Sequence, residues 1–466
     1  MKTSERIKLI ISRLEIVVAV ILFFVMLFSC GLYIDIKLNG KISNLPPLSE
    51  NDYKMLLRSS LSDDEVDADD LLEPVFLGVK DSNQMMAVCP SDEIRNSFVG
   101  LVGDVVSDLF NGTVRTLDFS GENEFHDYVD TVKNSDRFIL LSFFDDLPSS
   151  VVVPCMFDSI IVDGSQKVFD FKHLFLLPDE DGNLYACALN SENTVTEMYP
   201  EQSVGYDKIL GKTYDKSDGW IEFEFLTGNF PNPVYLSSLI MSSYRIEPLS
   251  TVYGKDDGQK WVKNLFDVFS LNENLVRSFT SGDKTEINYV EESGELIIND
   301  DGLVEFKASD IGGIGLEKYA VNVSDSLLIS TFSDKIFGLK KIINRLFDGD
   351  YGFSFSMVGY DYDDDTDTLK VYFKYMTDGI FLYDDPYDAV FDICDNKLVY
   401  AKFNAIMCSR LTEPQGAVIP QKFASISVRT KDDSNAETYL FLQDNDGDGI
   451  STPIWGVPCV LSEVSD

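Results

Sequence analysis

The sequence predicts an α+β fold in which an N-terminal transmembrane helix is followed by three mixed α+β extracytoplasmic domains built on antiparallel sheets. Three observations support this prediction. An uncharged run near the amino terminus is long enough to span a bilayer, short apolar strands alternate with single amphipathic helices in the rest of the chain, and Asp-Gly turns typical of hairpins recur. Since 466 residues is about three times the size of an average domain, several domains are expected.

Charge and composition exclude several functional classes. The 78 acidic residues outnumber the 38 Lys and Arg residues, which gives a net charge of −40. Such a chain repels phosphate backbones, so the sequence argues against nucleic-acid binding. The chain has only 2 histidines, His126 and His173, so histidine-based catalytic triads and multi-histidine zinc sites are not expected.

The amino terminus predicts a membrane anchor. Residues 1–15 are mainly basic and residues 16–34 carry no charge. A helix over Ile16 to Ile34 would be about 28 Å long, close to the ~30 Å hydrocarbon core of a bilayer. Because the basic flank stays inside, residues 1–15 should be cytoplasmic and the body should lie outside the cell membrane. The small residues Ala19, Ser29 and Gly31 either pack against another membrane helix or face lipid.

Cys30 leaves a second interpretation of this segment open. Leu27-Phe28-Ser29-Cys30 fits a bacterial lipoprotein cleavage box, in which Cys30 would be lipidated and become the first residue. An uncleaved anchor is favoured because the apolar run continues past Cys30 to Ile34, whereas a cleavable signal has an apolar region of only about 7 to 15 residues.

Residues 35–70 are predicted to form a polar stalk, and an N-terminal α+β domain is predicted over residues 71–250. Its first half should contain, in order, a strand, a helix, a strand, a short helix and a strand. These elements are expected over residues 75–79, 91–110, 114–119, 124–132 and 138–144. Turns such as Asp181-Gly182 predict hairpins further along.

Two further α+β domains are predicted over residues 251–335 and 336–466. The central one should open with a helix whose apolar stripe contains Trp261, Leu265, Val268 and Phe269, and the last one with a helix over residues 333–347. In the central domain, strands are expected over residues 287–289, 296–298 and 303–306, the last two joined through Asn299 to Gly302. In the last domain, strands are expected over residues 353–360, 369–375, 389–394, 397–407 and 438–442.

Motifs that carry chemistry are scarce. The sequence has no HExxH, GxSxG, P-loop or dinucleotide-binding fingerprint, so we expect no catalytic residues, no cofactor and no enzymatic activity. One acidic loop resembles the start of a calcium loop, with Asp444, Asp446 and Asp448 at positions 1, 3 and 5. Position 12 is Trp455 instead of Glu, so the loop is either a weak calcium site or a solvated hairpin connection.

The six cysteines beyond the predicted anchor are sparse and form no CxxC pair. Because the chain is large enough to fold without cross-links, buried free thiols are favoured over disulfides. These cysteines are Cys89, Cys155, Cys187, Cys394, Cys408 and Cys459.

Several segments resemble the YycH regulators in order and spacing. The central match begins with Phe266 and Phe269, continues through residues 274–279, Tyr289 and Leu296, and ends at Val304-Glu305-Phe306. Residues 138–143 with Leu147-Pro148, and residues 453–457 after Tyr439-Leu440-Phe441, also agree. The turn after Tyr289, Val290-Glu291-Glu292-Ser293-Gly294, departs from the Thr-Asp-Gly type expected there, so the chain resembles a distant member, and the related YycI is a neighbouring possibility.

The resemblance implies a single-pass accessory protein of the WalK (YycG) sensor histidine kinase of Gram-positive bacteria. It implies that the chain modulates two-component signalling in cell-envelope homeostasis, with the kinase and a sister YycI-like regulator as partners. The alternative is a surface lipoprotein, lipidated at Cys30, that binds an envelope ligand or acts on cell-wall material.

Overall fold

The computed structural model describes one compact unit within Val66–Asp466. The described residues are 72–88, 98, 102–103, 105–106, 108–117, 119, 121–149, 151–152, 169–213, 220–226, 230–249, 255–280, 286–309, 312–316, 332–347, 351–363, 366–429, 437–444 and 449–457. Within these ranges, no helix combines the length and hydropathy needed to cross a membrane. The predicted anchor, Ile16 to Ile34, and the predicted stalk lie outside them.

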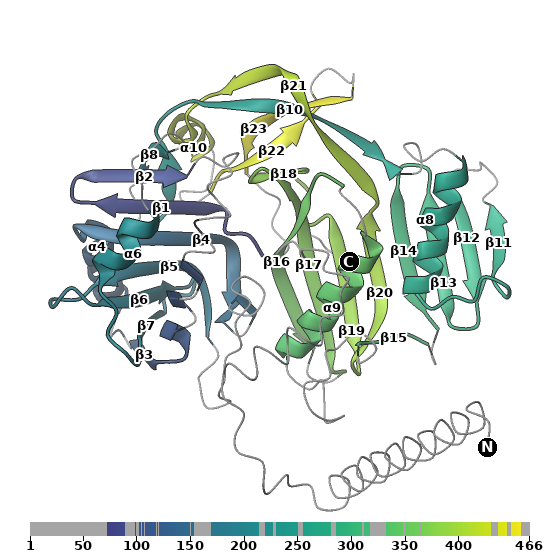
Figure 1. Ribbon diagram of the computed structural model, residues 1–466, viewed down its shortest axis with the longest axis horizontal. Coiled ribbons are helices and arrows are strands. Elements are labelled where there is room, and N and C mark those ends of the chain that lie inside the picture. Colours follow the sequence, from purple (N-terminus) through teal and green to yellow (C-terminus); the bar gives the residue numbers. More distant parts are fainter. Residues whose placement is uncertain are drawn as a thin grey trace, which may run out of the picture. The chain divides into compact units, whose positions relative to one another are not determined.

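The first sheet is formed by the N-terminal part of the chain (Figure 1). It has 9 strands, paired antiparallel in the order β3-β7-β6-β5-β4-β1-β2-β8-β9. The strands are β1 (Phe76–Asp81), β2 (Gln84–Val88), β3 (Thr113–Leu117), β4 (Arg137–Pro148), β5 (Asp170–Pro178), β6 (Leu184–Leu189), β7 (Val195–Tyr199), β8 (Trp220–Phe225) and β9 (Pro233–Tyr235).

Both faces of this sheet are covered by apolar side chains of helices. Helix α4 (Glu122–Asn134) buries Phe125, Val129 and Val132, which share a cluster with Phe138 and Phe175 of the sheet. The spacing of three and four residues puts these side chains on one helical face. The described residues between 98 and 110 are helical, and their buried members belong to the cluster on the other face, as the predicted stripe required. Helix α6 spans Tyr206–Thr213.

The second sheet combines strands from the rest of the chain. It has 14 strands, 12 of them in the order β11-β12-β13-β14-β20-β19-β17-β18-β22-β23-β10-β21, while β15 pairs with β20 and β16 with β17. Only the β18–β22 pair is parallel among the described strands. The strands are β10 (Leu239–Pro248), β11 (Arg277–Thr280), β12 (Glu286–Glu291), β13 (Gly294–Asn299), β14 (Leu303–Ala308), β15 (Ile314–Gly315), β16 (Ser354–Asp363), β17 (Thr368–Thr377), β18 (Ile380–Phe381), β19 (Ala389–Cys394), β20 (Lys397–Asn404), β21 (Ile406–Val418), β22 (Tyr439–Gln443) and β23 (Ile450–Gly456).

Helices α8 (Lys255–Val268) and α9 (Phe332–Leu346) lie side by side against this sheet (Figure 1). The predicted stripe of α8 is buried, and just beyond the helix end Phe269 stacks on Phe306 of β14 at 4.4 Å between ring centroids. Nδ2 of Asn264 donates a hydrogen bond to the carbonyl of Arg345 at 2.9 Å, which ties the two helices together. The mixed α+β class with antiparallel sheets is therefore confirmed.

Strands of the predicted central and C-terminal domains share this second sheet. The connection is made by β14 and β20, whose register places Phe306 opposite Ala401. The hairpin predicted through Asn299 to Gly302 is confirmed, since β13 pairs with β14 and the N–H of Gly302 donates to the carbonyl of Asn299. The three domain boundaries themselves stay predictions.

The single strand predicted over residues 397–407 is wrong, because the chain breaks at Ala405 into β20 and β21. The N–H of Ala405 donates to Gly302, whereas its carbonyl accepts from Leu249. The chain changes its pairing partner at this residue, from β14 before it to β10 after it. A sequence of continuous strand-forming residues carries no mark of such a change.

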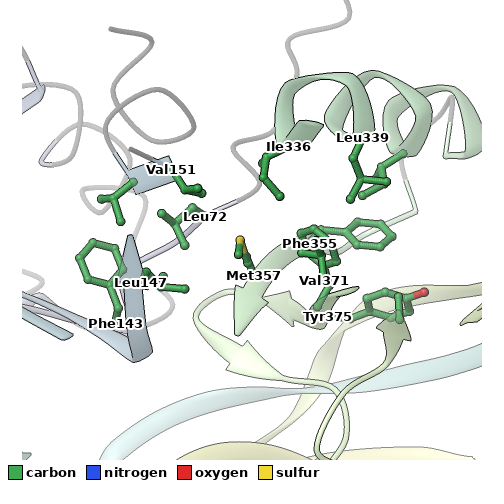
Figure 2. Packing of buried hydrophobic residues seen from close by; sticks show 14 of the residues in the cluster. Leu72, Phe143, Leu147, Val151, Ile336, Leu339, Phe355, Met357, Val371 and Tyr375 are labelled. Carbon is green, nitrogen blue, oxygen red and sulfur yellow. The ribbon is translucent and has the colours of Figure 1, made fainter. Parts of the chain in front are cut away.

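One core of buried side chains runs through both sheets. Figure 2 shows Met357 of β16 between Leu72 and Leu147 on one side and Phe355 on the other. All four belong to the same cluster, and β16 contacts β4. Burial of apolar area contributes about 25 cal/mol per Å², so this shared core binds the two sheets into one unit.

Two glycines with positive φ provide a test of the packing around Gly352, which lies just before β16. Gly352 has a φ of +75° and an added Cβ would meet the carbonyl oxygen of Cys408 at 1.8 Å, whereas Gly182 has a φ of +79° and open space around it. Both alanine variants incur left-handed strain of about 1–2 kcal/mol, but only Gly352→Ala adds a backbone clash. We expect Gly352→Ala to lower the free energy of unfolding by more than ~4 kcal/mol. Denaturant titration of the two variants measures the difference, and equal losses would contradict the described packing.

Candidate functional site

A small cavity lies where the first sheet meets β18, β22, β23 and helix α10 (Gln421–Arg429). We call it the inter-sheet cavity. Ser142 and His173 line it from the first sheet, and Phe381, Glu437 and Tyr439 line it from the other side. Its volume is about 40 Å³. That is room for two or three water molecules, whereas sites for larger organic ligands measure about 300–1,000 Å³.

His173 is the unusual group in this cavity. The register of β4 and β5 places it opposite Ser142, and its Nδ1 lies 2.8 Å from the Ser142 hydroxyl oxygen. The side chain is 1% exposed, and its Nε2 has no hydrogen-bond partner among the described residues. Burial lowers the pKa of His173 to about 3, so the imidazole is neutral at physiological pH. A buried polar nitrogen requires a partner, and water in the cavity fits that requirement.

An ion pair crosses the same junction. Nζ of Lys172 on β5 lies 2.7 Å from a carboxylate oxygen of Glu437, just before β22. The hydroxyl of Tyr439 also donates to Glu437. Burial opposes ionisation of both partners, yet their mutual attraction outweighs it, so the pKa of Lys172 is raised and the pKa of Glu437 is lowered. The pair is therefore charged and links β5 to the segment that enters β22.

Neutral hydrogen bonds join α10 to both sides of the cavity. Oε1 of Gln421 accepts from the backbone N–H of Tyr235 on β9, and Nε2 of Gln421 donates to the carbonyl of Thr438 at 2.7 Å. The hydroxyls of Ser425 and Thr438 lie 2.7 Å apart. Because every one of these groups is buried, losing one partner would leave the other unsatisfied.

A second buried charge cluster lies within the C-terminal part of the second sheet. Lys374 on β17 is 0% exposed, donates to the carbonyl of Asp385, and lies 5.3 Å and 5.4 Å from the ring centroids of Phe381 and Phe441. The neighbouring Asp388 accepts from the N–H of Tyr375 at 2.7 Å. Burial raises the pKa of Asp388 to about 7, against the smaller opposing effect of Lys374.

Sequence reasoning missed both clusters. Strand alternation places Lys374 on the same face of β17 as Lys370 and Tyr372. Because these side chains are polar, the sequence predicts that this face is exposed to solvent. The chain covers Lys374 only because β18 and β22 pair beside β17. For His173, strand alternation with Phe171 and Phe175 is a sequence signal of burial. Its partner Ser142 has no such signal, because it comes from another strand.

The predicted site residues are only partly described. Asp444 lies at the end of β22, where its carboxylate accepts a hydrogen bond from the N–H of Gly449 at 3.0 Å. Asp446 and Asp448 lie outside the described residues, as do Ala19, Ser29, Cys30 and Gly31. In the described part of the chain, no cluster of three or more His, Cys, Asp or Glu side chains is placed to hold a metal ion. The calcium site stays a prediction.

Three cysteines of the body are described, and all three are free. Cys187 and Cys408 are buried and Cys394 is half-buried. Burial raises the pKa of the Cys187 and Cys408 thiols to about 12, so neither is a reactive thiolate. Free thiols are thus confirmed at these positions, while Cys89, Cys155 and Cys459 lie outside the described residues.

A solved structure has a similar fold over most of this chain. The crystal structure of YycH from Bacillus subtilis aligns with a TM-score of 0.54 over 83% of this chain and 93% of that chain, at 14% sequence identity. The chain has a YycH-like fold. The resemblance to YycH seen in the sequence is thereby confirmed at the level of the fold. Its segments lie in or next to β4, α8, β11, β12, β13, β14, β22 and β23.

A structure of an uncharacterized protein from Eubacterium rectale covers 55% of this chain and 89% of that chain at 12% identity, with a TM-score of 0.33. No family model matches the chain, and no curated protein matches it.

The Lys172–Glu437 pair predicts strong coupling between its members. Lys172→Met leaves a carboxylate at the junction without its cation, at a cost on the order of 3 kcal/mol. Adding Glu437→Gln removes that charge and keeps an acceptor for Tyr439, so the double variant should recover at least ~1 kcal/mol. Denaturant titrations of the two single variants and the double variant measure the coupling.

The surface pair Lys263–Glu273, at 2.9 Å with both side chains 57% exposed, is the matched control. The same two substitutions there should change the free energy of unfolding by less than ~0.5 kcal/mol. Additive losses at Lys172 and Glu437 would contradict a charged pair at the junction.

His173 predicts acid sensitivity. Its pKa of about 3 in the folded state lies below the ordinary 6.5, so the unfolded chain binds the extra proton more readily. The contribution of the neutral histidine to the free energy of unfolding is therefore complete above pH ~6.5. It is lost as pH falls toward 3, at up to about 1.4 kcal/mol per pH unit. In His173→Gln the free energy of unfolding should fall less between pH 6.5 and 4 than in the parent chain.

Ser142→Ala serves as the control, because it removes the hydroxyl beside Nδ1 but keeps the titrating ring. It should lower stability by about 1 kcal/mol and leave the pH slope in place. If His173→Gln and the parent chain show the same slope, the histidine is not held neutral by burial.

Proposed function

We propose that this chain is a non-enzymatic, membrane-anchored regulator that modulates a WalK-type sensor histidine kinase in two-component signalling of the cell envelope. One observation carries the proposal, namely the likeness of its fold to YycH over 83% of the chain. The order of YycH-like segments along the sequence supports it. In this proposal the helix over Ile16 to Ile34 spans the cell membrane, and the body lies outside it.

Regulation of this kind requires a difference in binding. A regulator shifts an equilibrium between kinase states only if it binds one state better than the other. In our proposal the anchor packs beside kinase transmembrane helices through Ala19, Ser29 and Gly31, where small side chains permit close approach. The extracytoplasmic domains contact the sensor domain of the kinase or a sister YycI-like regulator.

The inter-sheet cavity is too small to hold an organic ligand. It has a volume of about 40 Å³, and its histidine is neutral. The proposal therefore assigns the activity of the chain to contacts with partner proteins.

A second candidate function rests on Leu27-Phe28-Ser29-Cys30. If cleavage occurs before Cys30, the mature chain is a lipoprotein that binds an envelope ligand or acts on cell-wall material. Mass spectrometry of the mature protein distinguishes the two candidates. An acylated Cys30 at the new amino terminus supports the lipoprotein, and an intact amino-terminal segment through Cys30 supports the anchor.

Reconstitution tests the regulator. The kinase, its response regulator and the full chain are combined in lipid vesicles, and phosphorylation of the response regulator is measured with and without the chain. We expect the chain to change that rate several-fold. A variant in which residues 16–34 are shuffled, at constant composition and hydropathy, should lose the effect because helix packing depends on the positions of the small residues.

The two parts of the proposal fail separately. A retained effect in the shuffled variant would move the interaction to the extracytoplasmic domains. If the unaltered chain neither raises nor lowers the rate of phosphorylation, the proposed regulatory function is wrong.

A further inference from the structure

Strand β11 forms one end of the second sheet, at the right of Figure 1. Within the described part of the chain it pairs with β12 alone. All of its residues, Arg277 to Thr280, are exposed. An edge strand presents backbone donors and acceptors that favour pairing with another strand.

Two of the other described sheet ends, β9 and β21, carry features that block such pairing. Strand β9 has 3 residues and begins with Pro233, and β21 contains Pro414. Proline lacks the N–H needed to extend a ladder. By contrast, β11 has no proline, and nothing in its sequence interrupts a ladder.

Apolar side chains are exposed around this edge. Leu275 is 62% exposed and Phe279 is 57% exposed. Val290, 37% exposed, lies opposite Arg277, and Phe279 lies opposite Asn288, so these residues share one face of the β11–β12 pair. Exposed apolar side chains beside an open strand edge are typical of an interaction surface.

We propose that β11 pairs antiparallel with β11 of a second copy of this chain, about a two-fold axis at Ser278. An antiparallel pair of identical strands is two-fold by nature, and this register keeps each face of the sheet continuous across both copies. Arg277 of each copy then lies opposite Phe279 of the other. The guanidinium meets the aromatic ring in both halves of the interface, so the strand is complementary to itself.

Charge favours this edge as the meeting point of two copies. The chain has a net charge of −40, so most pairs of surfaces on two copies repel each other. Residues 274–280, Asn-Leu-Val-Arg-Ser-Phe-Thr, contain one charged side chain, and it is the cation Arg277. Carboxylate repulsion between two β11 edges is therefore small.

Site-specific cross-linking tests the pairing in the full chain, held in lipid vesicles. Directly opposite residues of antiparallel strands have Cα atoms about 4.5–5.5 Å apart, which suits a disulfide. Ser278→Cys should therefore form covalent dimers under mild oxidation. Thr280→Cys is the matched control, because it lies on the same strand and face but its symmetry mate would be about 14 Å away. We expect at least a tenfold higher dimer yield from Ser278→Cys, after subtraction of the yield of the unaltered chain.

Two further variants test the chemistry of the interface. On the Ser278→Cys background, Phe279→Ala should lower the dimer yield several-fold, whereas Phe423→Ala, at another exposed phenylalanine on α10, should leave it unchanged. Equal yields from Ser278→Cys and Thr280→Cys would indicate random collision and overturn the proposal. Absence of dimers, or cross-linking of Ser278→Cys only to a different protein in native membranes, would also overturn it.

Discussion

Pairing of β10 with β21 is the interaction on which the arrangement of the two sheets depends. β10 follows directly from the last strand of the first sheet, yet its partner lies some 170 positions further along the chain, with Leu239 opposite Val418 and Pro248 opposite Ile406. Side chains reinforce the pair, since Arg410 donates to Ser242 at 3.0 Å. The N–H of Leu249, just past β10, donates to Ala405 at the point where β20 becomes β21. Because β10 also pairs with β23, and β23 with β22, this strand carries the chain from the first sheet to the strands that line the inter-sheet cavity.

Two buried ionisable side chains, His173 and Asp388, change the stability of the fold with pH in opposite directions. His173 favours folding at higher pH, because its folded pKa lies below 6.5. Asp388 acts in the other direction, since burial raises its pKa from 3.8 to about 7 and the folded state therefore binds the proton more readily. Its contribution to stability falls as pH rises from ~4 to ~7. The two windows overlap between about pH 4 and 6.5, so a flat stability profile in that range is compatible with two strongly perturbed groups. Substitution of one residue at a time is needed to see either.

Local patterns in the sequence were sufficient to predict most helices and strands, but not which strands pair with each other. The stripe Trp261, Leu265, Val268 and Phe269 has the spacing of one helical face, and all four side chains are buried beside α8. The turn at Gly302 joins the strands that the sequence indicated. Pairing across long distances left no such mark, as the missed break at Ala405 shows. The contacts of Lys172 and Lys374 were equally invisible, because a charged residue in a strand normally faces water, and only the tertiary structure covers Lys374 and brings Glu437 to Lys172.

The likeness to YycH at 14% identity separates what the fold requires from what function requires. A sheet position needs an apolar side chain of suitable size, and many sequences satisfy that need. A binding surface needs particular side chains at particular places, because a few residues carry most of the binding energy. The fold can therefore persist while the surfaces diverge. For this chain the shared architecture establishes the fold, and the identity of any partner has to be established from its own exposed residues, such as those along β11.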